Sequence, residues 1–236
     1  MELRLLSSES DRRIFAARTE QIRAKHGAGF KERSRSRLAR IHLTFGNLYA
    51  LFENDGDPAE KMIAGLVMHD LEMFPQTCPR PDLSHLPPRS VIEVSELWSR
   101  AIGAGALARV GAAILAGLLD ARAILVYLGV KPFDGTPFYR ATGFVDAGDP
   151  VEYPYLETVN GEAIWAQPMI LEGETLAKLT RVASQLIVET NEDHSVLRFR
   201  NFLKGKTVGG RPAFVDDATP TAGARLGHEE HAAPMQ

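Results

Sequence analysis

The sequence has a single cysteine, Cys78, among its 236 residues. One cysteine excludes an internal disulfide and a cysteine-rich zinc site. Long hydrophobic runs are also lacking: the longest, residues 104–119, is interrupted by Arg109 and is shorter than a bilayer requires. The first residues show no apolar core of a signal peptide. We therefore expect a cytoplasmic protein with no membrane span.

Neither sign of charge is in large excess, since the sequence has 27 Lys and Arg residues and 30 Asp and Glu residues. A net charge of −3 gives no reason to expect general attraction to nucleic acid, and no nucleic-acid partner is predicted. One local cluster is basic, and its members are Lys31, Arg33, Arg35, Arg37 and Arg40. Such a run is usually a solvated face, and the alternative is a docking surface for an acidic partner.

Signatures of several common sites are missing. The histidines His42, His69 and His85 show no metal-ligand spacing, so no metal is predicted, and His69 is interpreted as structural. A nucleophile elbow of the G-x-S-x-G type does not occur. Cys78 has no identifiable activating neighbour and is interpreted as structural.

Periodicity predicts one α/β (α+β) domain with a mixed central sheet flanked by helices. Apolar residues recur at helical spacing along 107–118, where Gly111 and Gly117 indicate close approach to a neighbouring element. The pair Asn160-Gly161 predicts a two-residue hairpin turn. The predicted parts are a domain over 1–203 with helices in 8–40, a core over 48–170 and a helix at 174–190, and a flexible tail over 204–236.

One segment carries a specific pattern. A predicted strand at 90–98 runs into a turn with the spacing Arg100-x-x-Gly103-x-Gly105, and the turn opens a helix. Small residues let the backbone approach an anion, and the first N–H groups and the dipole of a helix favour negative charge. The turn lacks the spacing of a dinucleotide fingerprint and the Gly-Lys-Ser/Thr ending of a P-loop. A pyrophosphate is the expected ligand of this turn. The alternative is that the glycines of the turn serve helix packing alone.

A second segment follows the apolar strand predicted at 123–130. It reads Thr136-Pro137-Phe138-Tyr139, then Arg-Ala-Thr, and then Gly143-Phe144. With the turn before it and the order of elements, this segment resembles the GNAT (N-acetyltransferase) superfamily. The resemblance implies a sheet splayed at an acyl-CoA site and transfer of an acyl group from acetyl-CoA or a longer acyl-CoA to a small-molecule amine.

The same resemblance implies roles for particular residues. Backbone N–H groups at the end of the first strand would polarise the thioester carbonyl, at Leu97, Trp98 and Ser99. The turn and first helical residues would hold the pyrophosphate, namely Arg100, Ile102, Gly103, Ala104, Gly105 and Ala106. Tyr139 matches the tyrosine that protonates the departing thiolate. A core aromatic residue is the alternative reading of Tyr139.

Two carboxylates precede the turn and are candidates for the general base. Strand alternation places Glu93 with Ser95 and Leu97, and Glu96 on the opposite face with Val94 and Trp98. An unpaired carboxylate is costly to bury, which favours a role for the one that points inward. An ion pair with an N-terminal arginine such as Arg18 is the alternative.

The run Glu93-Val94-Ser95-Glu96-Leu97 also resembles the E-x-S-R-F segment of acyl-homoserine lactone synthases and long-chain N-acyl amino acid synthases, with Glu96 in place of the arginine. That narrower resemblance implies acyl carrier protein as a possible donor, docked on the basic cluster at Lys31, Arg33, Arg35 and Arg37. A GNAT-like protein that binds CoA or an acyl carrier without turnover is the alternative from another functional class.

Overall fold

A computed structural model gives the fold for the described residues, which are 1–26, 44, 46–53, 62–73, 78–101, 103–130, 134–158, 160–199, 207–208 and 211–212. The predicted basic docking surface and Ile102 lie outside them. So does the predicted tail over 204–236, apart from the two short pieces that pair as β11 (Thr207–Val208) and β12 (Arg211–Pro212). The proposed limits of the domain and tail therefore stay predictions.

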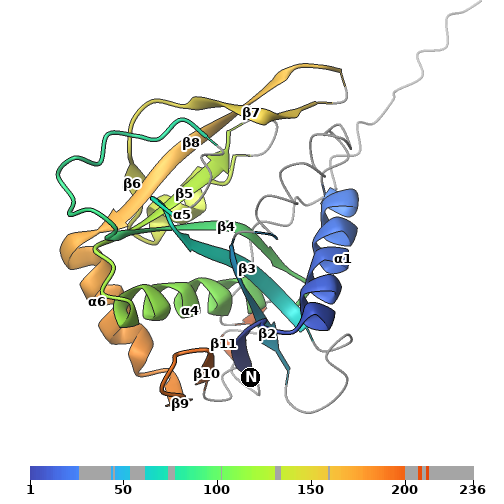
Figure 1. Ribbon diagram of the computed structural model, residues 1–236, viewed down its shortest axis with the longest axis vertical. Helices are drawn as coiled ribbons and strands as arrows, with labels where there is room; N and C mark the ends of the chain where they lie inside the picture. The colour runs from blue at the N-terminus through green and yellow to red at the C-terminus, as the bar shows by residue number, and fades with distance from the viewer. Residues whose placement is uncertain are drawn as a thin grey trace, which may run out of the picture.

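The described strands form one ten-stranded mixed sheet, in the order β6-β8-β5-β4-β3-β2-β1-β10-β9 with β7 beside β8 (Figure 1). All described neighbours run antiparallel except β4 and β5, which are parallel. This confirms the predicted mixed sheet flanked by helices. The strands are β1 (Glu2–Leu5), β2 (Asn47–Phe52), β3 (Met62–Asp70), β4 (Val91–Ser99), β5 (Ala123–Gly129), β6 (Val145–Asp146), β7 (Val151–Glu157), β8 (Ala163–Glu172), β9 (Ile187–Thr190) and β10 (Val196–Phe199).

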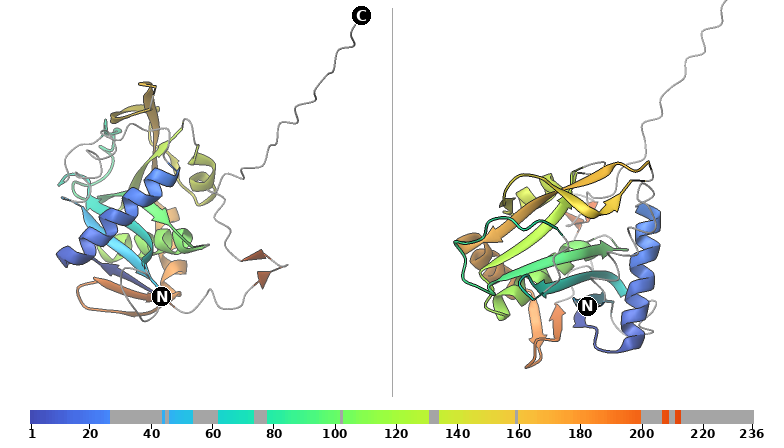
Figure 2. Two further views of the ribbon diagram at one scale, coloured as in Figure 1. Left: turned by 90° about the vertical axis from the view of Figure 1, so that its right-hand side faces the viewer. Right: turned by 45° about the horizontal axis from the view of Figure 1, so that its top comes forward.

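Helices cover both faces of the sheet (Figures 1 and 2). Because side chains alternate along a strand, Tyr49 and Leu51 of β2 pack on the side of α4 (Ala104–Leu118), whereas Leu48 and Ala50 pack on the side of α1 (Glu9–His26). Helix α6 (Gly173–Ser184) packs against α4. Ser8 caps the start of α1, since the Asp11 N–H donates to its Oγ at 3.0 Å.

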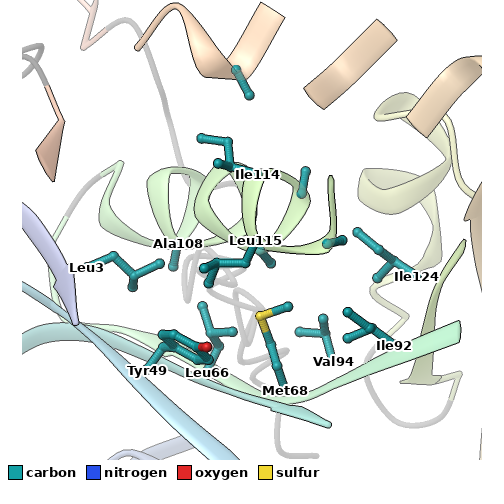
Figure 3. Packing of buried hydrophobic residues seen from close by; sticks show 14 of the residues in the cluster. Leu3, Tyr49, Leu66, Met68, Ile92, Val94, Ala108, Ile114, Leu115 and Ile124 are labelled. Atoms are coloured by element: carbon teal, nitrogen blue, oxygen red, sulfur yellow. The ribbon is translucent and has the colours of Figure 1, made fainter. Parts of the chain in front are cut away.

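Helix α4 forms the centre of the larger core. Ala108, Ile114 and Leu115 are buried, and Figure 3 shows Leu3, Tyr49, Leu66 and Met68 beneath them. The predicted close approach is confirmed, because a Cβ on Gly111 would lie 2.5 Å from Leu3 Cδ2. At Gly117 it would lie 2.5 Å from Thr180 Cγ2. The close packing of α4 against Leu3 and Thr180, which only glycine allows at these two positions, offsets the poor helix propensity of glycine.

The helix predicted over 174–190 is wrong at its C-terminal end. Helix α6 stops at Ser184, and residues 187–190 form β9. The run Ile187-Val188-Glu189-Thr190 is rich in β-branched side chains, which favour strands. Strand β9 pairs with β10, and β10 pairs with β1, with Glu2 opposite Arg198. The sheet is therefore wider than predicted on the side of β1.

The predicted hairpin at Asn160-Gly161 exists, but its loop is longer than two residues. The Thr158 N–H donates to the Glu162 carbonyl, and the Gly161 N–H donates to the Thr158 carbonyl, both at 3.0 Å. Three residues therefore lie between the pair that closes the turn. Gly161 has φ +84°, the left-handed conformation that ends a three-residue hairpin loop.

Candidate functional site

The two parallel strands β4 and β5 separate partway along their length. They pair only where Val91–Glu93 lies beside Ala123–Leu125, although β4 continues to Ser99 and β5 to Gly129. The other edge of β5 keeps its pairing with β8 as far as Gly129. A cavity of about 490 Å³ opens where the strands part. Beyond Glu93, the edge of β4 that faces this opening has no ladder partner among the described residues.

A bulge in β4 lies beside this opening. Ser95 is opposite Val67 and Trp98 is opposite Gly65, so β4 has one more residue than β3 over this stretch. Glu96 lies at the bulge with φ +53°, an uncommon conformation for a residue with a side chain. Such backbone strain persists where the surrounding structure imposes it, and it gathers at functional sites.

The bulge overturns the predicted alternation beyond Ser95. Leu97 packs with the core on the α4 side, and Trp98 packs on the α1 side against Phe15, with ring centroids 5.5 Å apart. The prediction had placed Leu97 with Glu93 and Trp98 with Val94. It failed because a single extra residue inverts the faces of the residues that follow it.

The cavity passes between the two faces of the sheet. Val94, Leu97 and Val126 line it from the α4 side of the strands, and Ser95, Trp98 and Tyr127 line it from the α1 side. Three helices complete the wall: Gly105 and Arg109 come from α4, Phe138 and Tyr139 from α5 (Thr136–Ala141), and Ile22 from α1. The remaining lining residues are Glu96, Ser99, Leu128 and Gly135. The wall of the cavity therefore contains side chains from both faces of the sheet.

The predicted anion turn lies at one side of the cavity. The Arg100 N–H donates to the Ile63 carbonyl at 2.8 Å, which fixes the turn to β3, and the Arg100 side chain is exposed. Gly103 precedes α4 with φ +79°, a conformation that favours glycine. The first turn of α4 has neither a side-chain cap nor an acidic residue. Ala104 and Ala106 follow in this turn. The Ala104 N–H already donates to the Ala101 carbonyl at 3.1 Å, and the remaining N–H groups of the first turn and the helix dipole suit an anion.

Tyr139 reaches the same cavity from α5. Its ring packs edge-on against Phe144 at 5.2 Å and against Phe138 at 5.8 Å between centroids. The guanidinium of Arg109 lies 4.0 Å from the Phe138 ring centre and 5.9 Å from that of Tyr139. Gly143 follows α5 with φ +96°, a left-handed conformation that is common after the last residue of a helix. The structure thus brings Tyr139 together with the bulge and the start of α4.

Glu93 lies deeper than the cavity wall and is 4% exposed. Its Oε2 lies 3.4 Å from Nε2 of His69, which is directly opposite on β3 and is also buried. This contact identifies His69 as a close neighbour of Glu93 that the sequence alone did not indicate, since the expected alternative was an ion pair with an arginine of the N-terminal helix. Only the register between β3 and β4 brings His69 opposite Glu93, and a single sequence does not contain that register.

Two further side chains lie close to Glu93. Burial, and then the charge of Glu93, raise the pKa of the Cys78 thiol to about 12. Burial together with Glu93 and Cys78 raises the pKa of Tyr127 above its usual range, and its hydroxyl donates to the Pro79 carbonyl at 3.1 Å. Both groups therefore stay protonated near neutrality.

Among the described residues, no three His, Cys, Asp or Glu side chains gather as a metal ion would require, and no described helix is long and apolar enough to cross a membrane.

No protein-family model and no curated protein sequence matches the chain. Solved structures do resemble it in fold. An N-acyl amino acid synthase from uncultured soil microbes is 12% identical, with a TM-score of 0.48 over 78% of this chain and 98% of its own. A ribosomal-protein-alanine N-acetyltransferase from Brucella melitensis is 11% identical, with a TM-score of 0.46 over 72% and 99%.

A GNAT family acetyltransferase from Elizabethkingia anophelis, solved with acetyl-CoA bound, is 15% identical. Its TM-score is 0.39 over 58% of this chain and 82% of its own. At these identities and TM-scores, the likeness extends to the general arrangement of helices and strands and not to substrates or site residues.

Proposed function

We propose that this protein is an N-acyltransferase that moves an acyl group from the thioester of acetyl-CoA or a longer acyl-CoA to a small-molecule amine. One observation carries the proposal: the cavity between the separated strands β4 and β5 runs from the start of α4 to the face of the sheet that holds Glu93. A thioester donor and an amine can reach one point in it from opposite faces.

The donor side fits an elongated arm that ends in a pyrophosphate. Beyond Glu93, the backbone groups on the free edge of β4 can bond the amides of a pantetheine arm as a neighbouring strand would. The pyrophosphate would lie on the turn from Arg100 to Ala106, where Gly103 lets the backbone approach and the first turn of α4 has no side-chain cap on its N–H groups. Ile102 belongs to the same proposed set.

The chemistry needs one bond formed and one broken. The amine nitrogen attacks the carbonyl carbon of the thioester, a C–N bond forms, and the C–S bond breaks to release the thiol. The attacking nitrogen loses one proton, for which Glu93 or Glu96 is the proposed base, and the sulfur gains one, for which Tyr139 is the proposed acid. The charge on the carbonyl oxygen would be stabilised by backbone N–H groups at the bulge, among Leu97, Trp98 and Ser99.

The apolar wall gives room for an acyl chain. Val94, Leu97, Val126 and Leu128 line the cavity beside the separated strands. Acyl carrier protein as an alternative donor rests on the basic cluster at Lys31, Arg33, Arg35 and Arg37, which lies outside the described residues. An acyl-homoserine lactone synthase or N-acyl amino acid synthase reaction would use the same donor side with a different amine.

A thermal-shift experiment tests the donor site. We expect acetyl-CoA, octanoyl-CoA or free CoA to raise the unfolding midpoint, because a ligand of the folded state stabilises it. Gly103→Glu should abolish the shift by placing a carboxylate at the anion turn. Gly103→Ala is the matched control, since it imposes the same backbone strain without charge and should keep most of the shift. A shift that survives Gly103→Glu would place the donor elsewhere, and no shift with any CoA compound would overturn the CoA donor.

A further inference from the structure

Two residues in the wall of the cavity each carry a buried polar atom that has no hydrogen-bond partner among the described residues. These atoms are the Ser95 Oγ and the Trp98 Nε1. The Trp98 side chain lines the cavity although it is only 6% exposed. A buried polar group without a partner costs free energy, and folded proteins contain few of them. A ligand in the cavity that bonds to both atoms would remove this cost.

The bulge in β4 brings these two residues to the same face of the sheet. Regular alternation would place them on opposite faces, because their positions differ by three. The extra residue at Glu96 reverses the alternation, so Ser95, opposite Val67, and Trp98, opposite Gly65, become successive residues of one face. Val67 and Trp98 both pack in the core on the α1 side, which identifies that face. The pair of polar atoms thus depends on the bulge.

The chemistry of the two atoms limits what can bind them. An indole N–H can only donate, so its partner must offer a lone pair, whereas the Ser95 hydroxyl can donate or accept. Contact with the Phe15 ring, at 5.5 Å between centroids, and close packing over Gly65 hold the Trp98 indole in place. A carbonyl oxygen has two lone pairs and can accept from both groups at once.

The charges nearby favour a neutral oxygen over a carboxylate. Glu93 precedes Ser95 by two residues on the same face of β4, and Glu96 lines the cavity. A carboxylate bound between Ser95 and Trp98 would lie near both acids, and like charges repel strongly where water is scarce. Arg109, a cation in the wall, comes from α4 on the other side of the sheet.

We propose that Ser95 and Trp98 form a subsite for a neutral carbonyl oxygen of the acceptor, which makes the acceptor an α-amino amide. This inference rests on the proposed acyl transfer. The subsite lies on the bulge, whose backbone N–H groups are proposed to hold the thioester carbonyl, so the bound oxygen has to lie within a few bonds of the attacking nitrogen. An α-amino amide has that spacing. A plain alkylamine leaves both polar atoms unpaired, and a site built for hydrogen bonding discriminates against such an analogue.

Binding of two matched amines tests the subsite without requiring turnover. Butan-2-amine is alaninamide with the carboxamide replaced by an ethyl group. In the presence of free CoA, Kd is measured for both amines in the native protein, Ser95→Ala and Trp98→Phe. Each variant should weaken the binding of alaninamide by about two- to tenfold, the effect of losing one neutral hydrogen bond, and leave that of butan-2-amine unchanged. Alanine, with its carboxylate, should bind the native protein more weakly than alaninamide.

A second readout uses the native protein and stands even if Trp98→Phe fails to fold. The sequence has two tryptophans, Trp98 and Trp165, so two indole N–H resonances are expected in a nitrogen-15 NMR spectrum. Trp165 is 44% exposed on β8 and does not line the cavity. Alaninamide should move the Trp98 resonance downfield, as a new hydrogen bond does, and leave the Trp165 resonance in place. Butan-2-amine should not produce the downfield shift.

Matched controls separate the subsite from general damage. Trp165→Phe and Ser184→Ala repeat the two changes at exposed residues, and both should keep the native Kd for each amine. Equal losses for the two amines in the test variants, an unmoved Trp98 resonance, or no binding of alaninamide would overturn the subsite. A protein that binds alaninamide in this way but transfers no acyl group would keep the subsite and overturn acyl transfer, and transfer without this binding would do the reverse.

Discussion

Phe15 of α1 and Trp98 of β4 meet above Gly65 of β3, with ring centroids 5.5 Å apart and ring planes inclined at 54°. A Cβ on Gly65 would overlap Phe15 Cε2 and would lie 2.6 Å from two carbons of the Trp98 indole. The absence of a side chain at Gly65 therefore lets the indole, just past the bulge, lie against β3 and under α1.

Gly65→Ala should destabilise the protein by about 1–3 kcal/mol, since an added methyl group in a packed core forces rings or backbone to shift. The free energy of unfolding in urea measures this. Gly135→Ala is the matched control, because a Cβ there meets no atom within 4 Å and its φ of −85° suits any residue. A loss at Gly65→Ala no greater than that of the control would contradict the packing described for Phe15 and Trp98.

Tyr139→Phe should lower kcat by about 100-fold, the low end for a general acid, and leave KM for the donor nearly unchanged. The ring contacts with Phe138 and Phe144 are kept, so the unfolding midpoint should stay close to that of the native protein. Thiol release from the CoA thioester measures the rate. A variant with the native kcat would return Tyr139 to the role of a core aromatic residue.

Cys78 makes stability depend on pH in the alkaline range. The thiol pKa is raised from 9.0 to about 12 in the folded protein, so between these values the folded state binds more protons than the unfolded state. The stabilisation is present below pH 9 and is lost as pH rises toward about 12. Unfolding midpoints should therefore fall less steeply across this window in Cys78→Ala than in the native protein. Parallel slopes for the two proteins would show that the thiol does not titrate abnormally.

Leu197→Ala should cost about 2–5 kcal/mol, the usual range for truncating a buried leucine. Leu197 is 1% exposed and lies opposite Leu3 of β1. Val188→Ala on the neighbouring β9 is the control, because Val188 is 64% exposed and surface changes usually stay within about 0.5 kcal/mol. Similar small effects at both positions would mean that β10 contributes little to the folded sheet in solution.

Local patterns predicted much of the fold. The turn at Arg100, Gly103 and Gly105 precedes a helix, and Gly143 adopts the left-handed conformation after α5, because both depend on residues near in the chain. Strand and helix positions from 47 to 172 follow for the same reason. They show in periodicity and in turn residues, whatever the partner elements are.

The features that shape the site depend on distant residues. The bulge at Glu96 requires that β3 present Gly65 opposite Trp98, and the contact of His69 with Glu93 requires the exact pairing of two strands. Single-sequence patterns do not contain that register. The alternation rule accordingly placed Leu97 and Trp98 on the wrong faces, and His69 was interpreted as structural for lack of a visible neighbour.

The pairing of β1 with β10 sets an order for events during synthesis. Among the described strands of the sheet, β1 is made before the others and its neighbour β10 after them, and the Phe199 N–H closes the ladder on the Met1 carbonyl at 3.0 Å. Until then β1 is an open edge, which other chains can pair with. A nascent chain halted after α6 would carry that edge uncovered, so the protein should depend on chaperones most strongly just before translation reaches β10.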